Sequence, residues 1–201
     1  VLKPDHVLFQ SETMVDRVFL LDRSGSMESC WDDTIGGFNS FLTDQKATGG
    51  TLTLIQFDHE YQVTYESTEI EKVASLTRET YKPRGSTALL DAIGQLIKSW
   101  KGSSNPSVVI LTDGLENASK NFTKAHIKDL IEQKTKDGWT FAYLGANQDA
   151  FAEAGSIGIA AGCTMNYDAN RTPDAFRTLS AAMSSQASGQ TQTVNLSQQP
   201  I

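Results

Sequence analysis

The stretch that decides the fold reads VFLLDRSGS and spans residues 18–26. Its first four side chains form a short run of β-branched, aromatic and aliphatic residues, which is typical of a strand buried on both faces. The run ends at Asp22, and Ser24 and Ser26 then alternate around Gly25. Sheets of parallel strands carry their ligand sites at the carboxyl ends of the strands. The stretch therefore predicts a parallel sheet with a polar site directly after this strand.

Strand and helix patterns alternate through the rest of the chain. Further strands are expected at 52–57, 107–112, 139–144 and 163–167, with 61–65 as an antiparallel edge partner of 52–57. Apolar side chains at helical spacing predict helices near 35–48, 86–100, 127–131, 150–154 and 173–184. This alternation predicts an α/β protein with a doubly wound, three-layer αβα, Rossmann-like fold. Its sheet should be mostly parallel, with one antiparallel edge strand.

Composition and charge exclude several classes of protein. The chain has 201 residues, of which 39% are hydrophobic and 20% charged, close to ordinary globular usage and unlike a disordered or fibrous chain. A formal net charge of −7, without a cluster of Lys and Arg, argues against a nucleic-acid partner. The longest apolar runs, 18–21 and 108–111, are far shorter than the roughly 18 to 20 residues of a membrane span. We expect a globular protein without a membrane span.

One domain with an extension at each end is expected from the length of the chain. An N-terminal extension of residues 1–14 precedes a domain of residues 15–184, and the Gln-, Ser- and Thr-rich residues 185–201 form a polar, flexible tail. The absence of a secretory signal indicates a cytoplasmic location, although the chain does not begin with Met. Cys30 and Cys163 lack the spacing of a zinc site or a disulfide framework, so both are expected to be free thiols.

Oxygen-bearing side chains gather where the carboxyl ends of two predicted strands would meet. Asp22, Ser24 and Ser26 follow the first strand, Asp113 follows a later buried strand, and Thr87 precedes a long helix. If the two strands are neighbours, two carboxylates and three hydroxyls converge there. Hard oxygen donors without His or Cys suit Mg²⁺ or Mn²⁺, with Ca²⁺ as a less favoured alternative. These five residues are the candidate metal ligands.

Each candidate ligand also has an ordinary structural interpretation. Asp22 with Ser24, or Thr87 alone, are residues of the kind that cap the N-terminus of a helix. Asp113 followed by Gly114 is a common turn dipeptide. The order of the three motifs along the chain favours metal binding over these roles.

Other polar or aromatic residues near the same sheet edge receive a structural interpretation. Asp58, Glu60, Asp91 and Glu116 are interpreted as exposed charges. The three histidines lack neighbours at metal-ligand spacing, so no zinc site is expected. Trp31 is left open between an aromatic that faces a partner and a cover on the first helix.

Three motifs in this order, DRSGS at 22–26, GSTAL at 85–89 and ILTDG at 110–114, resemble the metal-ion-dependent adhesion site (MIDAS) of von Willebrand factor A (VWA) domains. The resemblance covers about residues 15–183 and implies the VWA fold. It also implies that one divalent cation, bound directly or through water, has one coordination position open for a Glu or Asp carboxylate of a protein partner. The implied ligands are Asp22, Ser24, Ser26, Thr87 and Asp113.

The resemblance carries two further implications. The segment YLGANQD, residues 143–149, is most similar to cytosolic VWA proteins of bacteria and their phages. In the family's sheet order, Cys30 and Cys163 lie at opposite edges, which are too far apart for a disulfide.

These observations predict a non-enzymatic module that binds an acidic side chain of a protein partner through Mg²⁺ or Mn²⁺. No P-loop motif is present, and Ser24 lacks the Gly-x-Ser-x-Gly setting of serine hydrolases. Two alternatives stay open. One is a subunit that regulates or docks on an AAA+ ATPase, as some bacterial family members do. The less favoured one is a Mg²⁺-dependent phosphotransfer enzyme with Asp22 as the nucleophile. The oligomeric state is also left open.

Overall fold

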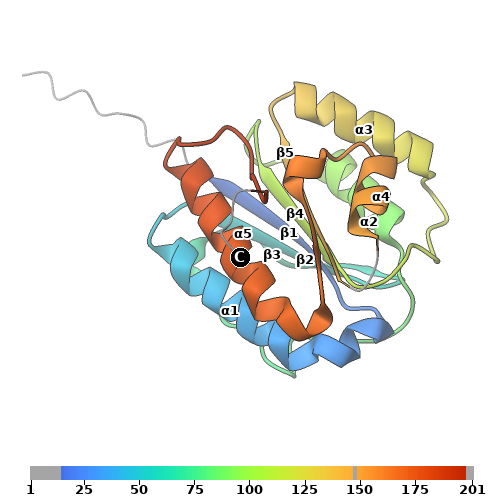
Figure 1. Ribbon diagram of the computed structural model, residues 1–201, viewed down its shortest axis with the longest axis horizontal. Helices are drawn as coiled ribbons and strands as arrows, with labels where there is room; N and C mark the ends of the chain where they lie inside the picture. Colours follow the sequence, from blue (N-terminus) through green and yellow to red (C-terminus); the bar gives the residue numbers. More distant parts are fainter. Residues whose placement is uncertain (1–14, 147–148, 198–201) are drawn as a thin grey trace, which may run out of the picture.

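A six-stranded sheet forms the centre of the protein. Figure 1 shows the computed structural model, which describes residues 15–146 and 149–197; the expected N-terminal extension, residues 1–14, lies outside them. The strands are β1 (Asp16–Asp22), β2 (Thr51–Phe57), β3 (Tyr61–Glu69), β4 (Ser107–Thr112), β5 (Thr140–Ala146) and β6 (Thr164–Tyr167). Their order is β3-β2-β1-β4-β5-β6, and of these strands only β3 runs antiparallel to its neighbour. The predicted sheet is confirmed.

Helices cover both faces of the sheet. They are α1 (Trp31–Lys46), α2 (Leu89–Ser99), α3 (Lys124–Lys136), α4 (Ala150–Ser156) and α5 (Thr172–Ala187). α1 and α5 pack on one face, and α2, α3 and α4 pack on the other (Figure 1). Short 3₁₀ helices lie at Gly25–Cys30, Ile70–Lys72, Ala161–Cys163 and Ala169–Arg171. The three-layer αβα architecture agrees with the doubly wound fold predicted from the sequence.

β1 lies inside the sheet and is buried on both faces. Phe19 and Leu21 belong to the core beneath α1 and α5, whereas Val18 and Leu20 belong to the core on the opposite face. Successive side chains of a strand point to opposite faces, so a strand covered on both sides needs a continuous apolar run. β1 pairs with β2 on one side and β4 on the other. The two strand ends that carry candidate ligands are therefore neighbours.

α1 begins earlier, and α2 later, than the sequence predicts. A 3₁₀ turn, Gly25–Cys30, follows β1, and α1 begins at Trp31 rather than near residue 35. α2 begins at Leu89 rather than near Thr87. The N-cap residues of these two helices and of the 3₁₀ turn make no capping hydrogen bond with their own side chains. The polar side chains before these starts are therefore free for other interactions.

The end of the described chain packs more closely than its composition indicates. α5 continues to Ala187, beyond its predicted end. Val194 and Leu196 are buried, and Leu196 N donates a hydrogen bond to Gly162 O. The residues that follow α5 therefore differ from the expected loose tail, because two apolar side chains among polar neighbours attach them to the core.

Candidate metal site

The carboxylate of Asp22 is fixed at the end of β1. Ser24 N donates a hydrogen bond to Asp22 Oδ1 at 2.6 Å, and Thr112 Oγ1 donates to Asp22 Oδ2 at 2.6 Å. Thr112 is the last residue of β4, so this bond joins the ends of two neighbouring strands. Asp22 is fully buried. Both of its oxygens therefore have a partner within the protein.

Three hydroxyl groups converge on one point beside Gly114. Ser24 Oγ lies 3.1 Å from Ser26 Oγ, and Ser26 Oγ donates a hydrogen bond to Asp113 Oδ1 at 2.6 Å. A methyl group added to Gly114 would lie 2.9 Å from Thr87 Oγ1. The same methyl group would lie 3.3 Å from Ser26 Oγ and 3.5 Å from Ser24 Oγ. The structure thus brings the five residues predicted from sequence to one place at the carboxyl edge of the sheet.

The donors gathered there fit a small divalent cation. Three hydroxyls and two carboxylates are hard oxygen ligands, and the two carboxylates balance a charge of 2+. Burial raises the pKa of Asp22 to about 6, and the negative charge of Asp113 adds to this increase. Burial also raises the pKa of Asp113. A cation beside both groups would favour their ionised forms and so oppose these increases.

The loop after β4 positions Thr87. Asn117 Oδ1 accepts a hydrogen bond from Thr87 N at 2.9 Å, and Thr87 O accepts from Asn117 N at 3.0 Å and from Ala118 N at 3.1 Å. The alternative interpretation of Thr87 as a helix cap is not supported, because the N-cap of α2 is Ala88. The Thr87 hydroxyl is instead the atom nearest to the position that a Cβ on residue 114 would occupy.

Two acidic residues interpreted as exposed charges hold this loop on α2. Glu116, which is half-buried, accepts a hydrogen bond from Leu90 N at 2.9 Å in the first turn of the helix. Asp91 accepts from the backbone amides of Lys120 and Phe122 at 2.9 and 3.0 Å. Although partial burial acts in the opposite direction, these amides hold the pKa of Asp91 below its usual range. Both acids are structural, but neither is simply a solvated charge.

The interpretation of Asp58 as an exposed charge is wrong. Asp58 is fully buried, and its Oδ2 accepts from Arg23 Nε at 3.0 Å and from Arg84 Nε at 2.8 Å. Asp58 Oδ1 accepts a hydrogen bond from Glu60 N at 2.6 Å. Asp58, His59 and Glu60 also form a group of possible metal ligands. Because two guanidinium groups already neutralise the Asp58 carboxylate, a second cation there is disfavoured.

The same network connects the loops that carry the candidate ligands. Arg84 N donates a hydrogen bond to Arg23 O at 2.7 Å, and Gly25 N donates to Gly85 O at 3.0 Å. Gly85 has a φ of +67°, a conformation that residues with a side chain adopt rarely. Ser24, Ser26 and Thr87 are therefore held by one connected set of loops. Sequence reasoning missed this network because its partners are far apart in the chain.

A buried tyrosine and a tryptophan cover the loop after β1 from the side of α1. Tyr81 is fully buried, and its hydroxyl donates a hydrogen bond to Asp22 O at 2.7 Å. Trp31 Nε1 donates to Tyr81 O at 2.7 Å, and the Arg78 guanidinium lies 4.6 Å from the centre of the Trp31 ring. Of the two interpretations left open for Trp31, the structure supports a cover on the start of α1.

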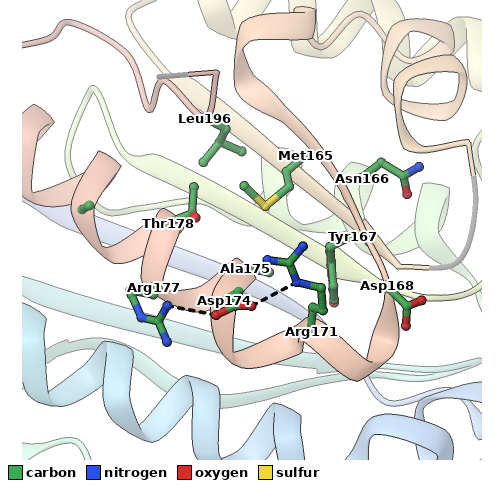
Figure 2. Close-up of a pocket in the computed structure, with 11 residues that line it drawn as sticks. Met165, Asn166, Tyr167, Asp168, Arg171, Asp174, Ala175, Arg177, Thr178 and Leu196 are labelled. Carbon is green, nitrogen blue, oxygen red and sulfur yellow. Dashed lines mark hydrogen bonds and ion pairs between the residues drawn. The ribbon is translucent and has the colours of Figure 1, made fainter. Parts of the chain in front are cut away.

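A cavity lies elsewhere, between β6 and α5 (Figure 2). It has a volume of about 660 Å³, and Met165 and Leu196 form part of its apolar lining. Arg171 and Arg177 both pair with Asp174 at its rim. None of the five candidate ligands lines this cavity. It is therefore separate from the candidate metal site.

Residues 17–116 match the family model of the von Willebrand factor type A domain. This range includes all five candidate ligands. This part of the chain is therefore similar to the von Willebrand factor type A domain, in agreement with the resemblance of its three motifs. Domains of this family commonly mediate metal-dependent interactions with other proteins.

Solved structures with the same fold include both adhesive and matrix proteins. The vWF domain of the pilus tip protein Mfa5 from Porphyromonas gingivalis is 12% identical, with a TM-score of 0.66 over 85% of this chain and 95% of that chain. The pilus adhesin SpaC from Lactobacillus rhamnosus GG is 15% identical, with a TM-score of 0.66 over 84% of this chain and 30% of that chain.

A third structure contains a metal. Proximal thread matrix protein 1 from the mussel byssus, with a zinc-occupied MIDAS motif, is 13% identical, with a TM-score of 0.60 over 82% of this chain and 46% of that chain. This chain spans only 42% to 46% of the first three structures that it matches. At these identities the likeness establishes the fold. No curated protein matches the chain.

Two further predictions concern the whole domain. Cys30 and Cys163 are free, as predicted. Within residues 15–146 and 149–197, no helix has both the length and the apolar character needed to cross a bilayer.

Proposed function

We propose that this chain is a non-enzymatic protein-binding module that depends on a divalent metal. Mg²⁺ or Mn²⁺ binds at the hydroxyl cluster, and a protein partner supplies a Glu or Asp carboxylate to the remaining coordination position. The proposed ligands are Asp22, Ser24, Ser26, Thr87 and Asp113. The observation that carries this proposal is the convergence of three hydroxyl oxygens on one point beside Gly114.

The proposed ligands divide into two kinds. The hydroxyls of Ser24, Ser26 and Thr87 surround the space beside Gly114. They are neutral, so they would bind the ion without reducing its net charge. Asp22 and Asp113 supply the two negative charges. An ion in this setting would still attract a further anionic oxygen, because charge-assisted contacts are strong where water is partly excluded. This charge balance supports a carboxylate as the partner's ligand.

The setting of Asp22 argues against phosphotransfer. A nucleophilic carboxylate must reach its substrate, but Asp22 is fully buried and both of its oxygens accept hydrogen bonds within the protein. We therefore expect no Asp22-dependent turnover of p-nitrophenyl phosphate in the presence of Mg²⁺. Turnover that Asp22→Ala abolishes would favour the enzyme instead.

Thermal unfolding tests whether the metal binds. For EDTA-treated wild type, Mg²⁺ or Mn²⁺ at 100 times its dissociation constant should stabilise the native state by about 2.7 kcal/mol, or roughly 5 to 10 °C. Asp22→Ala and Asp113→Ala should both lose this increase. Asp32→Ala, which removes an exposed carboxylate paired with Arg78, should retain it. No increase in wild type, or an increase retained in both ligand variants, would contradict the proposal.

A small carboxylate tests whether the bound metal has an open position. Acetate is titrated into the Mn²⁺-loaded protein, and the relaxation rate of water protons is measured. The rate should fall as acetate replaces a water molecule on the ion, whereas neutral acetamide of similar size should have little effect. Equal behaviour of acetate and acetamide would argue that the ion is fully enclosed by the protein.

A further inference from the structure

Two large apolar side chains are exposed in segments that follow β4 and β5, at the same edge of the sheet as the proposed metal site. Among the described residues, the exposed large apolar side chains are Val63, Leu115 and Phe151, at 47%, 59% and 51%. Leu115 lies two residues after Asp113, which follows β4, and Phe151 lies in the first turn of α4, which comes after β5. β4 and β5 are parallel neighbours, so the segments that follow them and carry these two residues both begin at the carboxyl edge of the sheet, which also holds the proposed metal site.

The backbone on both sides of Leu115 is held in place. Gly114 N donates a hydrogen bond to Thr112 Oγ1 at 3.2 Å on one side. On the other side, Glu116 Oε2 binds Leu90 N at 2.9 Å. Leu115 is therefore presented to solvent by a fixed loop. Its exposure leaves an apolar surface that no described part of the chain covers.

Phe151 is likewise directed outward by the packing of its helix. Ala150 and Ala154, which lie on the inner face of α4, are fully buried. The carboxylate of Asp149 caps the helix by accepting a hydrogen bond from Ala152 N at 3.1 Å. Because α4 is fixed with its alanines inward, Phe151 has to face solvent.

Val63 provides a contrast within the same protein. It lies on β3, the edge strand that is separated from β4 by β2 and β1. Two of the three exposed apolar side chains are thus at the metal-site edge, and the third is on a different part of the sheet. Val63 offers a matched control for the other two.

We infer that Leu115 and Phe151 form the apolar part of the interaction surface around the metal, and that the partner's acidic residue is flanked by large apolar side chains. This inference rests on the proposed function, since the metal supplies the contact for the acid. Apolar contacts around an ion exclude water and so strengthen its charge-assisted bond to a carboxylate. The chain carries a net charge of −7, so one acid among apolar residues meets less repulsion than a strongly acidic segment.

The experiment uses a phage-displayed library of peptides with six random residues on each side of one fixed Asp or Glu. The full chain is immobilised, and peptides are selected in Mg²⁺ and eluted with EDTA. Eluted peptides should be enriched in Leu, Ile, Phe, Trp or Met near the fixed acid. Affinities of the best synthetic peptide are then measured for wild type, Leu115→Ser, Phe151→Ser and Val63→Ser. We expect Leu115→Ser and Phe151→Ser each to weaken binding about 5- to 20-fold, and Val63→Ser to change it less than twofold.

The outcomes separate this inference from the function on which it rests. Peptides that need Mg²⁺ but show no apolar enrichment and bind Leu115→Ser and Phe151→Ser as tightly as wild type would overturn the inference and leave the metal-dependent module in place. Equal losses in all three serine variants would also overturn it, because the effect would not belong to the metal edge. A library without any Mg²⁺-dependent peptide, together with a wild-type protein that metal does not stabilise, would contradict the proposed function and the inference together.

Discussion

Gly114 is the residue on which the shape of the proposed metal site depends most directly. It has no side chain, and the hydroxyls of Ser24, Ser26 and Thr87 surround the position where a Cβ would lie. The Asp-Gly pair was interpretable from sequence as an ordinary turn. The structure adds a physical reason for glycine, since a methyl group there would occupy the space between the hydroxyls.

The variant Gly114→Ala should therefore lose metal binding while it keeps its fold. The added methyl group would lie 2.9 Å from Thr87 Oγ1, which displaces the hydroxyl but affects little else. In thermal unfolding, we expect the increase caused by Mg²⁺ to fall from about 5 to 10 °C to below about 2 °C. The control is Gly36→Ala, an exposed helical position with open space around it, which should be slightly stabilised and respond to metal as wild type does. A full metal response in Gly114→Ala would place the ion elsewhere.

Substitution of Asp22, a proposed metal ligand, is expected to stabilise the metal-free protein. Its pKa is raised to about 6 by burial, whereas an unfolded chain has an Asp pKa of about 3.9. The folded state therefore favours the protonated carboxyl group of Asp22. As the pH rises from about 4 to above 6, ionisation of this group lowers the free energy of unfolding. At pH 7.5 in EDTA, Asp22→Asn should be more stable than wild type, by about 1 to 3 kcal/mol, because it has no charge to bury.

Thermal unfolding of Asp22→Asn with and without Mg²⁺ checks this prediction. The variant should unfold several degrees above wild type in EDTA and should show no further increase with Mg²⁺. At pH 4, where the wild-type carboxyl is largely protonated in the native state, the two proteins should differ much less. An Asp22→Asn variant less stable than wild type in EDTA at pH 7.5 would show that the ionised carboxylate does not destabilise the fold.

At the scale of elements, a buried ionic network fixes the loops around the site. Asp58 at the β2–β3 turn binds Arg23 from the loop after β1 and Arg84 from the loop before α2. Motif spacing predicted the candidate ligands because each motif lies within a few residues of one strand or helix end. The network could not be predicted in the same way, since Asp58 is separated from Arg23 by 35 residues and from Arg84 by 26. Only the folded sheet brings these partners together.

Loss of the buried carboxylate in this network should be costly. Asp58→Ala removes the buried carboxylate that binds the guanidinium of Arg23 and leaves it only the more distant, exposed Glu60, which should reduce the free energy of unfolding by about 3 to 5 kcal/mol. Glu60→Ala removes an exposed carboxylate that pairs with Arg84, and should change it by less than about 1 kcal/mol. Urea unfolding of both variants measures the difference. Similar, small effects of the two substitutions would mean that the network contributes little.

At the scale of the whole molecule, the sheet can be predicted from the sequence more readily than the packing of the segment that follows α5. The apolar runs of β1 and β4 are continuous because helices cover both faces, and such runs are conspicuous in a sequence. The residues after α5 are mostly polar, which predicts a loose tail. Packing overrides this composition because, among the described residues that follow α5, Val194 and Leu196 are buried against the core. A prediction from composition describes the average character of a segment, whereas two apolar side chains are enough to hold this segment against the core.

The segment that follows α5 should therefore contribute to the free energy of unfolding. Leu196→Ala removes a buried side chain and should reduce the free energy of unfolding by about 2 to 4 kcal/mol. Thr193→Ala, at an exposed position in the same segment, should change it by less than about 0.5 kcal/mol. Urea unfolding of full-length variants provides the comparison. If Leu196→Ala were as stable as wild type, the segment would not be held to the core in solution.

The most direct test of the metal-dependent module is to count the ions that it binds. Mn²⁺ is titrated into the EDTA-treated, buffer-exchanged 201-residue chain, and free Mn²⁺ is measured by electron paramagnetic resonance. We expect one Mn²⁺ per chain in wild type, competition by Mg²⁺, and loss of this site in Asp113→Ala. Absence of a stoichiometric site in wild type, or an unchanged site in Asp113→Ala, would contradict a metal centre built from these hydroxyls and carboxylates.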